Sequence, residues 1–141
     1  MNIFNGKSIL VTGGTGSFGN ELVKTILNSS KPKKLVIFSR DEQKQYVMSQ
    51  QYSPDKFACL RYFIGDVRDS TRLNRAFSNI DIVVHAAAMK HVTASEYNPT
   101  ECIATNIIGA QNIIDAAIFN QVSKVIALST DKAANPVNLY G

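Results

Sequence analysis

The sequence predicts an α/β fold in which helices cover both faces of a parallel sheet. Five short apolar runs alternate with helix-length segments along the chain, at the spacing of right-handed βαβ units. The first run leads into the stretch TGGTGSFG, whose four glycines are typical of a tight turn that opens a helix at a dinucleotide site. We therefore expect a Rossmann-type sheet in the order 3-2-1-4-5, with the ligand at the carboxyl ends of the strands.

Length and composition indicate one globular domain, residues 1–141. The chain has 141 residues, of which 45% are hydrophobic and 18% charged, enough for a single core. Its net charge of +4 is scattered, which favours an anionic small ligand over a nucleic acid. No apolar run approaches the about 20 residues of a membrane span, and the N-terminus lacks the core of a signal peptide. We expect a cytoplasmic protein without membrane contact.

The cysteines and histidines do not form a metal-binding pattern. Cys59 and Cys102 lack the CxxC or Cys/His spacing of a metal site, and we expect both to be buried reduced thiols. His85 lies in an apolar run and His91 in the loop after it, so structural roles are favoured over zinc binding.

The first unit is a strand over Ile9–Val11 followed by a helix over Ser17–Asn28. Gly13 permits the tight turn, Gly16 allows the backbone to approach a pyrophosphate, and Gly19 allows the helix to pack on the strand. The helix directs its free N–H groups and its positive dipole end at the phosphates. The alternative is a glycine-rich turn without a ligand.

The second strand, Lys34–Phe38, ends at the candidate site for the adenosine ribose. Asp41 is near the position of the acid that binds this ribose in Rossmann folds, but Arg40 precedes it. An arginine there favours a 2′-phosphate and therefore NADP over NAD, with Ser39 and Lys44 as further contacts. The alternative is that Arg40 and Lys44 merely lie on the exposed face of a helix.

A helix over Asp41–Gln51 and a strand over Ala58–Ile64 follow. Asp66, just after the strand, is the candidate acceptor for the adenine amino group. Asp69 and Ser70 are interpreted as caps of the next helix, because both residue types are favoured there.

The fourth strand, Asp81–Ala88, ends in three alanines. These small side chains allow the backbone to approach a flat ligand. The loop over Met89–Val92 then carries one positive charge, Lys90, at the crevice where ligands bind.

A long helix over Pro99–Asn120 and a strand over Lys124–Leu128 complete the pattern. Helical spacing predicts that one side of the helix faces the sheet, and that this side is formed by Ile103, Ile107, Ala110, Ile114 and Ala117. Asn106 lies in this helix. Either its side-chain amide only has its hydrogen bonds satisfied within the core, or it supports a stretch of backbone that takes part in catalysis.

The motifs TGGTGSFG, SRDE, GDVRD, HAAAMKHV, STDKA and NPVNLYG together resemble the extended short-chain dehydrogenase/reductase superfamily. Within it, the chain is most similar to the inverting UDP-N-acetylglucosamine 4,6-dehydratases of pseudaminic acid biosynthesis, over essentially its whole length. The resemblance implies a UDP-sugar substrate and an NADP cofactor. It also implies oxidation at C4, loss of water across C5 and C6, and reduction at C6, with C5 inverted. We expect the full-length protein to be a homo-oligomer.

The resemblance also implies catalytic roles. Tyr140 takes the proton of the C4 hydroxyl with help from Thr130, which requires a nearby cation because a free phenol titrates near ~10. Asp131 is the acid at C6 if its pKa is raised, and Lys132 is the base at C5 if its pKa is lowered. The alternative is that Asp131 and Lys132 form an exposed ion pair of little consequence.

For the cofactor, the resemblance implies three groups of contacts. The phosphates are held by Thr15, Gly16, Ser17 and Phe18 and by Ser39, Arg40, Asp41, Glu42 and Lys44. The adenine lies at Asp66 and Val67, and the nicotinamide side lies at Ala86 and Lys90.

The expected lysine partner of Tyr140 would fall four positions later, beyond Gly141. We therefore expect an N-terminal part of a longer enzyme, ending before the substrate domain and inactive alone. Two alternatives stay open, a sugar-nucleotide epimerase or reductase and a non-catalytic NADP-binding module, because a fold alone does not choose a function.

Overall fold

A computed structural model describes residues 2–141 and contains the predicted parallel sheet. Its strand order, β3-β2-β1-β4-β5, confirms the expected topology. The strands are β1 (Ser8–Thr12), β2 (Lys34–Ser39), β3 (Leu60–Ile64), β4 (Ile82–His85) and β5 (Lys124–Ala127). All the pairings are parallel, so the strands' carboxyl ends meet at one edge.

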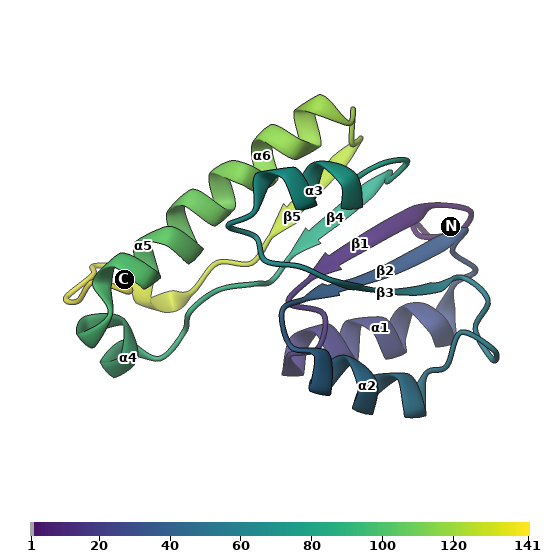
Figure 1. Ribbon diagram of the computed structural model, residues 1–141, viewed down its shortest axis with the longest axis horizontal. Coiled ribbons are helices and arrows are strands. Elements are labelled where there is room, and N and C mark those ends of the chain that lie inside the picture. Colours follow the sequence, from purple (N-terminus) through teal and green to yellow (C-terminus); the bar gives the residue numbers. More distant parts are fainter. Residues whose placement is uncertain (1) are drawn as a thin grey trace.

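Helices cover both faces of the sheet (Figure 1). One layer holds α1 (Ser17–Ser29) and α2 (Glu42–Gln51), and the other holds α3 (Ser70–Ala76) and α6 (Gly109–Phe119). Side chains alternate between the layers along β1: Leu10 packs toward α3 and α6, whereas Ile9 and Val11 pack toward α1 and α2. Burial on both faces explains why these strands are continuous apolar runs.

Local chemistry sets several element boundaries. The side chain of Asp41 accepts a hydrogen bond from the Lys44 N–H and caps α2, and Asp69 caps α3 in the same way through Arg72. Asp69 is therefore confirmed as a cap, whereas Ser70 is the first helical residue. The prediction for Cys59 was wrong, because β3 begins only at Leu60 and the thiol is half-buried.

The segment after β4 holds a helix that the sequence did not predict. β4 ends at His85, so the three alanines lie beyond the strand, and α4 (Val92–Tyr97) starts within the predicted loop region. The long helix that follows consists of α5 (Pro99–Ile103), a π-helical turn η1 (Ala104–Ile108) and α6. Cys102 in α5 is buried, as expected.

The predicted buried face of this long helix was wrong at its three isoleucines, whereas Ala117 is buried and Ala110 is partly buried. Ile107 is 61% exposed, and Ile103 and Ile114 are exposed as well. The sheet and its neighbours instead cover Cys102, Thr105, Gly109, Ile113, Ala116 and Ala117. The helix is apolar on both sides, so periodicity does not identify its core side, and the π-helical turn shifts the side chains after it.

One described helix, Pro99–Phe119, is long and apolar enough to cross a membrane by length and composition. The statement that no apolar segment approaches a membrane span was therefore wrong. The criterion is weak evidence, because core helices also meet it, and Ile113, Ala116 and Ala117 are buried within this fold.

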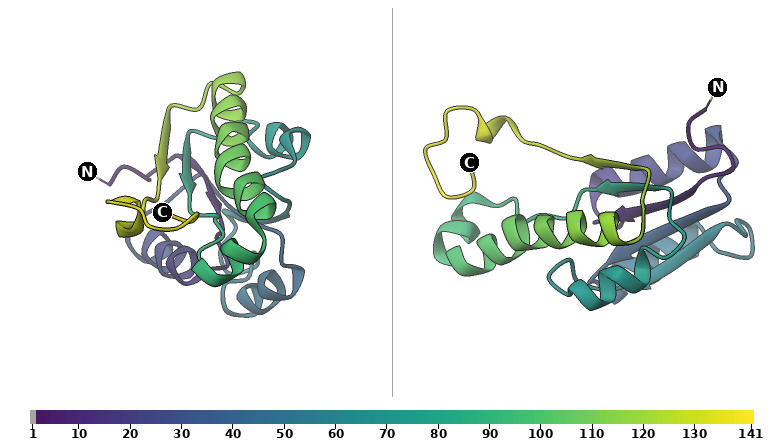
Figure 2. Two further views of the ribbon diagram at one scale, coloured as in Figure 1. Left: turned by 90° about the vertical axis from the view of Figure 1, so that its left-hand side faces the viewer. Right: turned by 90° about the horizontal axis from the view of Figure 1, so that it is seen from above.

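The segment after β5 leaves the sheet (Figure 2). It forms a single turn of 3-10 helix, η2 (Asp131–Ala133), and then turns back toward the end of the molecule that holds α4 and α5. The side chains of β5 itself are exposed.

Candidate functional site

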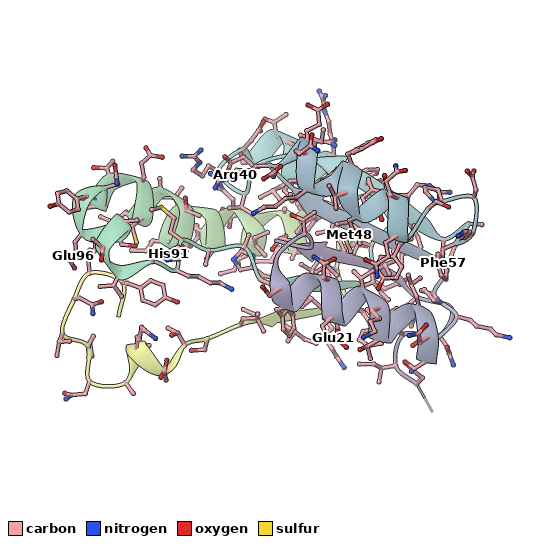
Figure 3. All side chains as sticks on the ribbon, turned by 90° about the horizontal axis from the view of Figure 1, so that it is seen from below. Glu21, Arg40, Met48, Phe57, His91 and Glu96 are labelled. Carbon is pink, nitrogen blue, oxygen red and sulfur yellow. The ribbon has the colours of Figure 1, made fainter. Side chains whose placement is uncertain are left out.

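A cleft of about 590 Å³ opens at the carboxyl edge of the sheet. It contains every residue predicted to contact the cofactor except Glu42 and Asp66. Figure 3 labels two lining residues, Arg40 near the start of α2 and His91 next to α4. The structure therefore brings together segments from β1, β2, β3 and β4, as the topology rule requires.

Gly13 forms the tightest part of the cleft floor. Its φ of +64° is a left-handed conformation that favours glycine. A Cβ placed there would lie 2.8 Å from the amide nitrogen of Ala87 and 2.9 Å from the carbonyl carbon of Ala86. The turn therefore depends on glycine both for its conformation and for its contact with the end of β4, as the sequence predicted.

The start of α1 is open toward the cleft. Gly16 is its N-cap residue and supplies no side chain to bond the first N–H groups. These free donors and the positive end of the helix dipole suit an anionic group such as a pyrophosphate. Gly19, one turn later, lies so close to Gly14 that an added Cβ would be 2.5 Å from its backbone, so the close packing at this glycine is against the turn and not against the strand itself.

A hydrogen-bond relay joins the ends of β1 and β4 beneath the cleft. The Thr12 hydroxyl accepts from the N–H groups of Ala86 at 3.1 Å and Ala87 at 3.3 Å, and lies 2.7 Å from Nδ1 of His85. Because Thr12 accepts two N–H groups, its own proton points to His85, which leaves the imidazole proton on Nε2. Burial lowers the pKa of His85, consistent with this neutral form. The sequence suggested a structural role for His85 but not this partner.

Arg40 and Lys44 line the cleft near the end of β2. The guanidinium of Arg40 is more than half exposed and lies 3.7 Å from the Asp66 carboxylate, and the ammonium of Lys44 lies 3.9 Å from Asp41. The carboxylate of Asp41 is thus already bonded to groups of α2, the helix that it caps. Two cations therefore border the part of the cleft where a 2′-phosphate was predicted.

Asp66 belongs to an ion-pair network that the sequence did not reveal. Arg68 donates to Asp66 through its backbone N–H at 2.9 Å and through its guanidinium at 2.7 Å and 3.0 Å. The same guanidinium reaches Glu101 of α5. Burial alone would raise the pKa of Asp66, but the bonds and charge of Arg68, followed by the charge of Arg40, lower it. Asp66 is thus held as a carboxylate beside the cleft, while Gly65 and Val67 line it.

Asn106 clamps the loop that carries Lys90. Its Oδ1 accepts from the Met89 N–H at 2.8 Å, and its Nδ2 donates to the Met89 carbonyl at 3.0 Å. Met89 and Lys90 both line the cleft. The Asn106 amide, which lies within the π-helical turn, is thus satisfied and at the same time holds the backbone of Met89, whereas a catalytic role for that backbone stays a prediction.

Replacing Asn106 by alanine is expected to destabilise the protein by about 1–3 kcal/mol, because two backbone groups lose their only side-chain partner. The measurement is urea unfolding, with Asn28→Ala as the matched control. Asn28 is exposed on α1, and its replacement should change the free energy of unfolding by less than about 0.5 kcal/mol. Equal losses in the two variants would contradict the clamp.

The proposed catalytic residues lie outside the cleft lining, on the segment after β5. Asp131 is 91% exposed, and its carboxylate lies 3.4 Å from the Lys132 ammonium. The charge and hydrogen bond of Lys132, with a further bond from Thr130, lower the pKa of Asp131. The condition set for a general acid, a raised pKa, is therefore not met by these residues alone, and the pair has the geometry of the exposed ion-pair alternative.

Tyr140 is partly buried at the returning end of this segment. A Cβ added to Gly141 would overlap the Lys132 carbonyl oxygen, so the loop closes on itself and brings the Tyr140 backbone back toward Lys132. The structure thus gathers the catalytic candidates in one loop.

Several cleft residues were not predicted, including Phe38, Met89, His91, Ala94 and Thr105. The last two lie on helices that pass the cleft only because of tertiary packing, so no local signal could have identified them. Within residues 2–141, no three His, Cys, Asp or Glu side chains are grouped as metal ligands would be.

Comparison with known proteins agrees with this geometry. The chain is 62% identical over 139 residues to the UDP-N-acetylglucosamine 4,6-dehydratase (inverting) of Campylobacter jejuni subsp. jejuni serotype O:23/36, covering 99% of this chain and 41% of that protein. It is 46% identical over 142 residues to the UDP-glucose 4-epimerase of Rickettsia massiliae, with the same two coverages. The X-ray structure of Pen from Bacillus thuringiensis matches with a TM-score of 0.93 at 43% identity, covering 99% of this chain and 42% of that one.

The chain therefore spans about two fifths of the length of the proteins it matches. The similarity to inverting dehydratases confirms the resemblance that the motifs indicated. A family model described as polysaccharide biosynthesis protein matches residues 9–141. Because that match covers nearly all of the sequence, the chain belongs to the polysaccharide biosynthesis protein family.

Proposed function

We propose that the protein carrying this sequence is an NADP-dependent, inverting UDP-N-acetylglucosamine 4,6-dehydratase, and that residues 1–141 are the N-terminal part of its dinucleotide-binding domain. The observation that carries the proposal is the cleft at the carboxyl edge of the sheet, lined by the TGGTGSFG turn, Arg40, Lys44 and the Ala86–Lys90 segment. The 62% identity to a protein of that activity supports the choice of reaction.

The residues present fit a dinucleotide. The uncapped start of α1 offers free N–H donors, and the glycines at positions 13 and 16 place no side chain between the backbone of the turn and a pyrophosphate. Arg40 and Lys44 would hold the 2′-phosphate, Asp66 and Val67 the adenine, and Ala86 and Lys90 the nicotinamide side. When bound, NADP would supply the hydride acceptor for C4 and the hydride donor for C6.

The chain's own residues would move the protons. Tyr140, with Thr130, takes the proton of the C4 hydroxyl as C4 becomes a carbonyl. Lys132 removes the C5 proton, and the electron pair of that bond expels the C6 oxygen. Asp131 gives that oxygen a proton, so that it leaves as water. These roles require the bound sugar to separate the Asp131–Lys132 ion pair and to raise the pKa of the Asp131 carboxyl by excluding water.

The test is proton NMR of UDP-N-acetylglucosamine in D₂O with the full-length protein and no added reductant. A new C6 methyl signal with deuterium at C5 is the expected result, and the C5 coupling reports inversion. An unchanged spectrum, or epimerisation at C4 without a methyl signal, contradicts the dehydratase proposal. Epimerisation is the second candidate, because the chain is also 46% identical to a UDP-glucose 4-epimerase. Cofactor binding without any turnover would indicate a non-catalytic module.

Replacing Arg40 by alanine is expected to weaken NADP binding about 10-fold to 100-fold, the effect of losing one charge-assisted contact. NAD binding should change little, because that cofactor lacks the 2′-phosphate. Isothermal titration calorimetry with both cofactors measures the difference. Arg75→Ala, an exposed arginine on α3 outside the cleft, is the control and should bind NADP normally. Equal weakening for both cofactors would contradict the 2′-phosphate assignment.

Location and assembly are also proposals. The scattered charge and the packing of the long helix on the sheet support a cytoplasmic protein, without nucleic-acid or membrane partners. The exposed isoleucines of α5 and α6 support a homo-oligomer in the full-length protein.

A further inference from the structure

One hydrogen bond joins the loop that carries the proposed catalytic residues to the rest of the molecule. Among the described residues, it is the only one from residues 129–141 to any earlier residue: the Leu139 N–H donates to Oε1 of Glu96 at 2.8 Å, across 43 positions of sequence. The other hydrogen bonds of this loop stay within it, such as Gly141 N–H to Asn138 and Ala134 N–H to Asp131. The position of the loop therefore depends strongly on Glu96.

The two residues that flank Tyr140 are both held. Leu139 is bonded to Glu96, and Gly141 lies against the carbonyl of Lys132. These two contacts restrain the backbone of Tyr140 relative to Lys132 and to α4. A phenol that must reach a C4 hydroxyl requires this kind of restraint, because a misplacement of about 1 Å can cost 100-fold in rate.

The helix that supplies Glu96 also borders the cofactor cleft. His91, the N-cap of α4, and Ala94 within it line the cleft, while Glu96 is exposed on the same short helix. Figure 3 shows Glu96 and His91 at the same end of the molecule as the returning loop. α4 thus contacts both the cleft, through His91 and Ala94, and the loop, through Glu96.

We propose that Glu96 is a positioning residue, whose carboxylate accepts the Leu139 N–H and thereby holds Tyr140 at the distance from the cleft that C4 oxidation requires. The inference rests on the proposed function. Glu96 acts as a hydrogen-bond acceptor, and neither its charge nor its proton takes part in the reaction. Glutamine, which keeps the same carbonyl oxygen, should therefore replace it, and alanine should not.

The test compares Glu96→Ala and Glu96→Gln in the full-length protein, with Thr93→Ala, an exposed residue of the same helix, as the control. Three kinds of measurement are made: the kinetics of C6 methyl formation, which give kcat and the KM for UDP-N-acetylglucosamine, the affinity for NADP, and hydrogen–deuterium exchange of the peptide containing Leu139. Glu96→Ala should lower kcat about 10-fold to 100-fold while KM and NADP affinity stay within about 3-fold. It should also speed exchange in that peptide. Glu96→Gln and Thr93→Ala should match the original protein in all three.

Two results would overturn the inference. A normal kcat and normal exchange in Glu96→Ala would mean that the Leu139 bond does not hold the loop. An equal loss of kcat in Glu96→Gln would mean that the charge of Glu96, not its acceptor oxygen, is what matters. If the original protein converts no sugar, the proposed function fails. The exchange measurement still decides whether Glu96 holds the loop: exchange at Leu139 should be slow in the original protein and in Glu96→Gln, and faster in Glu96→Ala.

Discussion

A Gly13→Ala variant is expected to lose dinucleotide binding and about 2–5 kcal/mol of stability. The left-handed backbone of Gly13 costs an alanine about 1–2 kcal/mol. The added Cβ also meets the backbone of Ala86 and Ala87 at 2.8–3.0 Å, and the shift that relieves this contact costs about 1–3 kcal/mol more. Because the same shift moves the turn that faces the pyrophosphate, we expect NADP affinity to fall more than about 100-fold.

Gly6→Ala separates these two causes. Gly6 has a φ of +68°, close to that of Gly13, but no atom lies within 4 Å of an added Cβ. This variant should lose only the about 1–2 kcal/mol of backbone strain and should bind NADP normally. Urea unfolding and calorimetric titration of NADP measure both quantities in both variants. Unchanged NADP affinity in Gly13→Ala would show that the close approach to β4 does not shape the cofactor site.

A Tyr140→Phe variant is expected to lower kcat for C6 methyl formation by about 10²-fold to 10⁴-fold, the range for loss of a general base. Phenylalanine keeps the aromatic ring. It also keeps the hydrogen bond between the Leu139 N–H and the Glu96 carboxylate, because neither group belongs to the Tyr140 side chain. NADP affinity should therefore stay within about 3-fold. The proton NMR assay with UDP-N-acetylglucosamine in D₂O measures the rate.

Tyr97→Phe is the matched control for this substitution. Tyr97 is 83% exposed on α4, and the loss of its hydroxyl should leave kcat unchanged. A Tyr140→Phe protein that still forms the methyl group at the original rate would remove Tyr140 from the proposed mechanism. The base for the C4 hydroxyl would then have to be sought among other residues of the full-length protein.

The sheet and the turn at its centre could be predicted because their signals are local. Ile9–Val11 is apolar, and glycines follow at the positions that a dinucleotide turn requires. Strand order then follows from the handedness of βαβ connections, which leaves few arrangements for five parallel strands. Most of the residues lining the cleft were predicted for the same reason, since carboxyl ends of parallel strands meet at one edge.

The long helix shows where local pattern fails. Isoleucines at 103, 107 and 114 follow helical spacing, yet Ile113 is buried and Ile114 is exposed. A helix with two apolar sides has no unique buried face in its sequence, and a π-helical turn changes the register after Ala104. The side facing the sheet was therefore decided by which residues fitted against α3 and β4.

Sequence by itself determined the α/β class, the strand order, the glycine turn and most of the cleft lining, because each depends on short-range periodicity and on general rules of chain connection. Only the tertiary structure decided the contacts between distant positions: Asn106 with Met89, Arg68 with Glu101, and Glu96 with Leu139. It also decided that Asp131 is exposed, so that the charge and hydrogen bonds of its chain neighbours Lys132 and Thr130 lower its pKa instead of burial raising it. The long-range contacts depend on which polar groups meet in space, and packing sets these partners and the solvent exposure of each side chain.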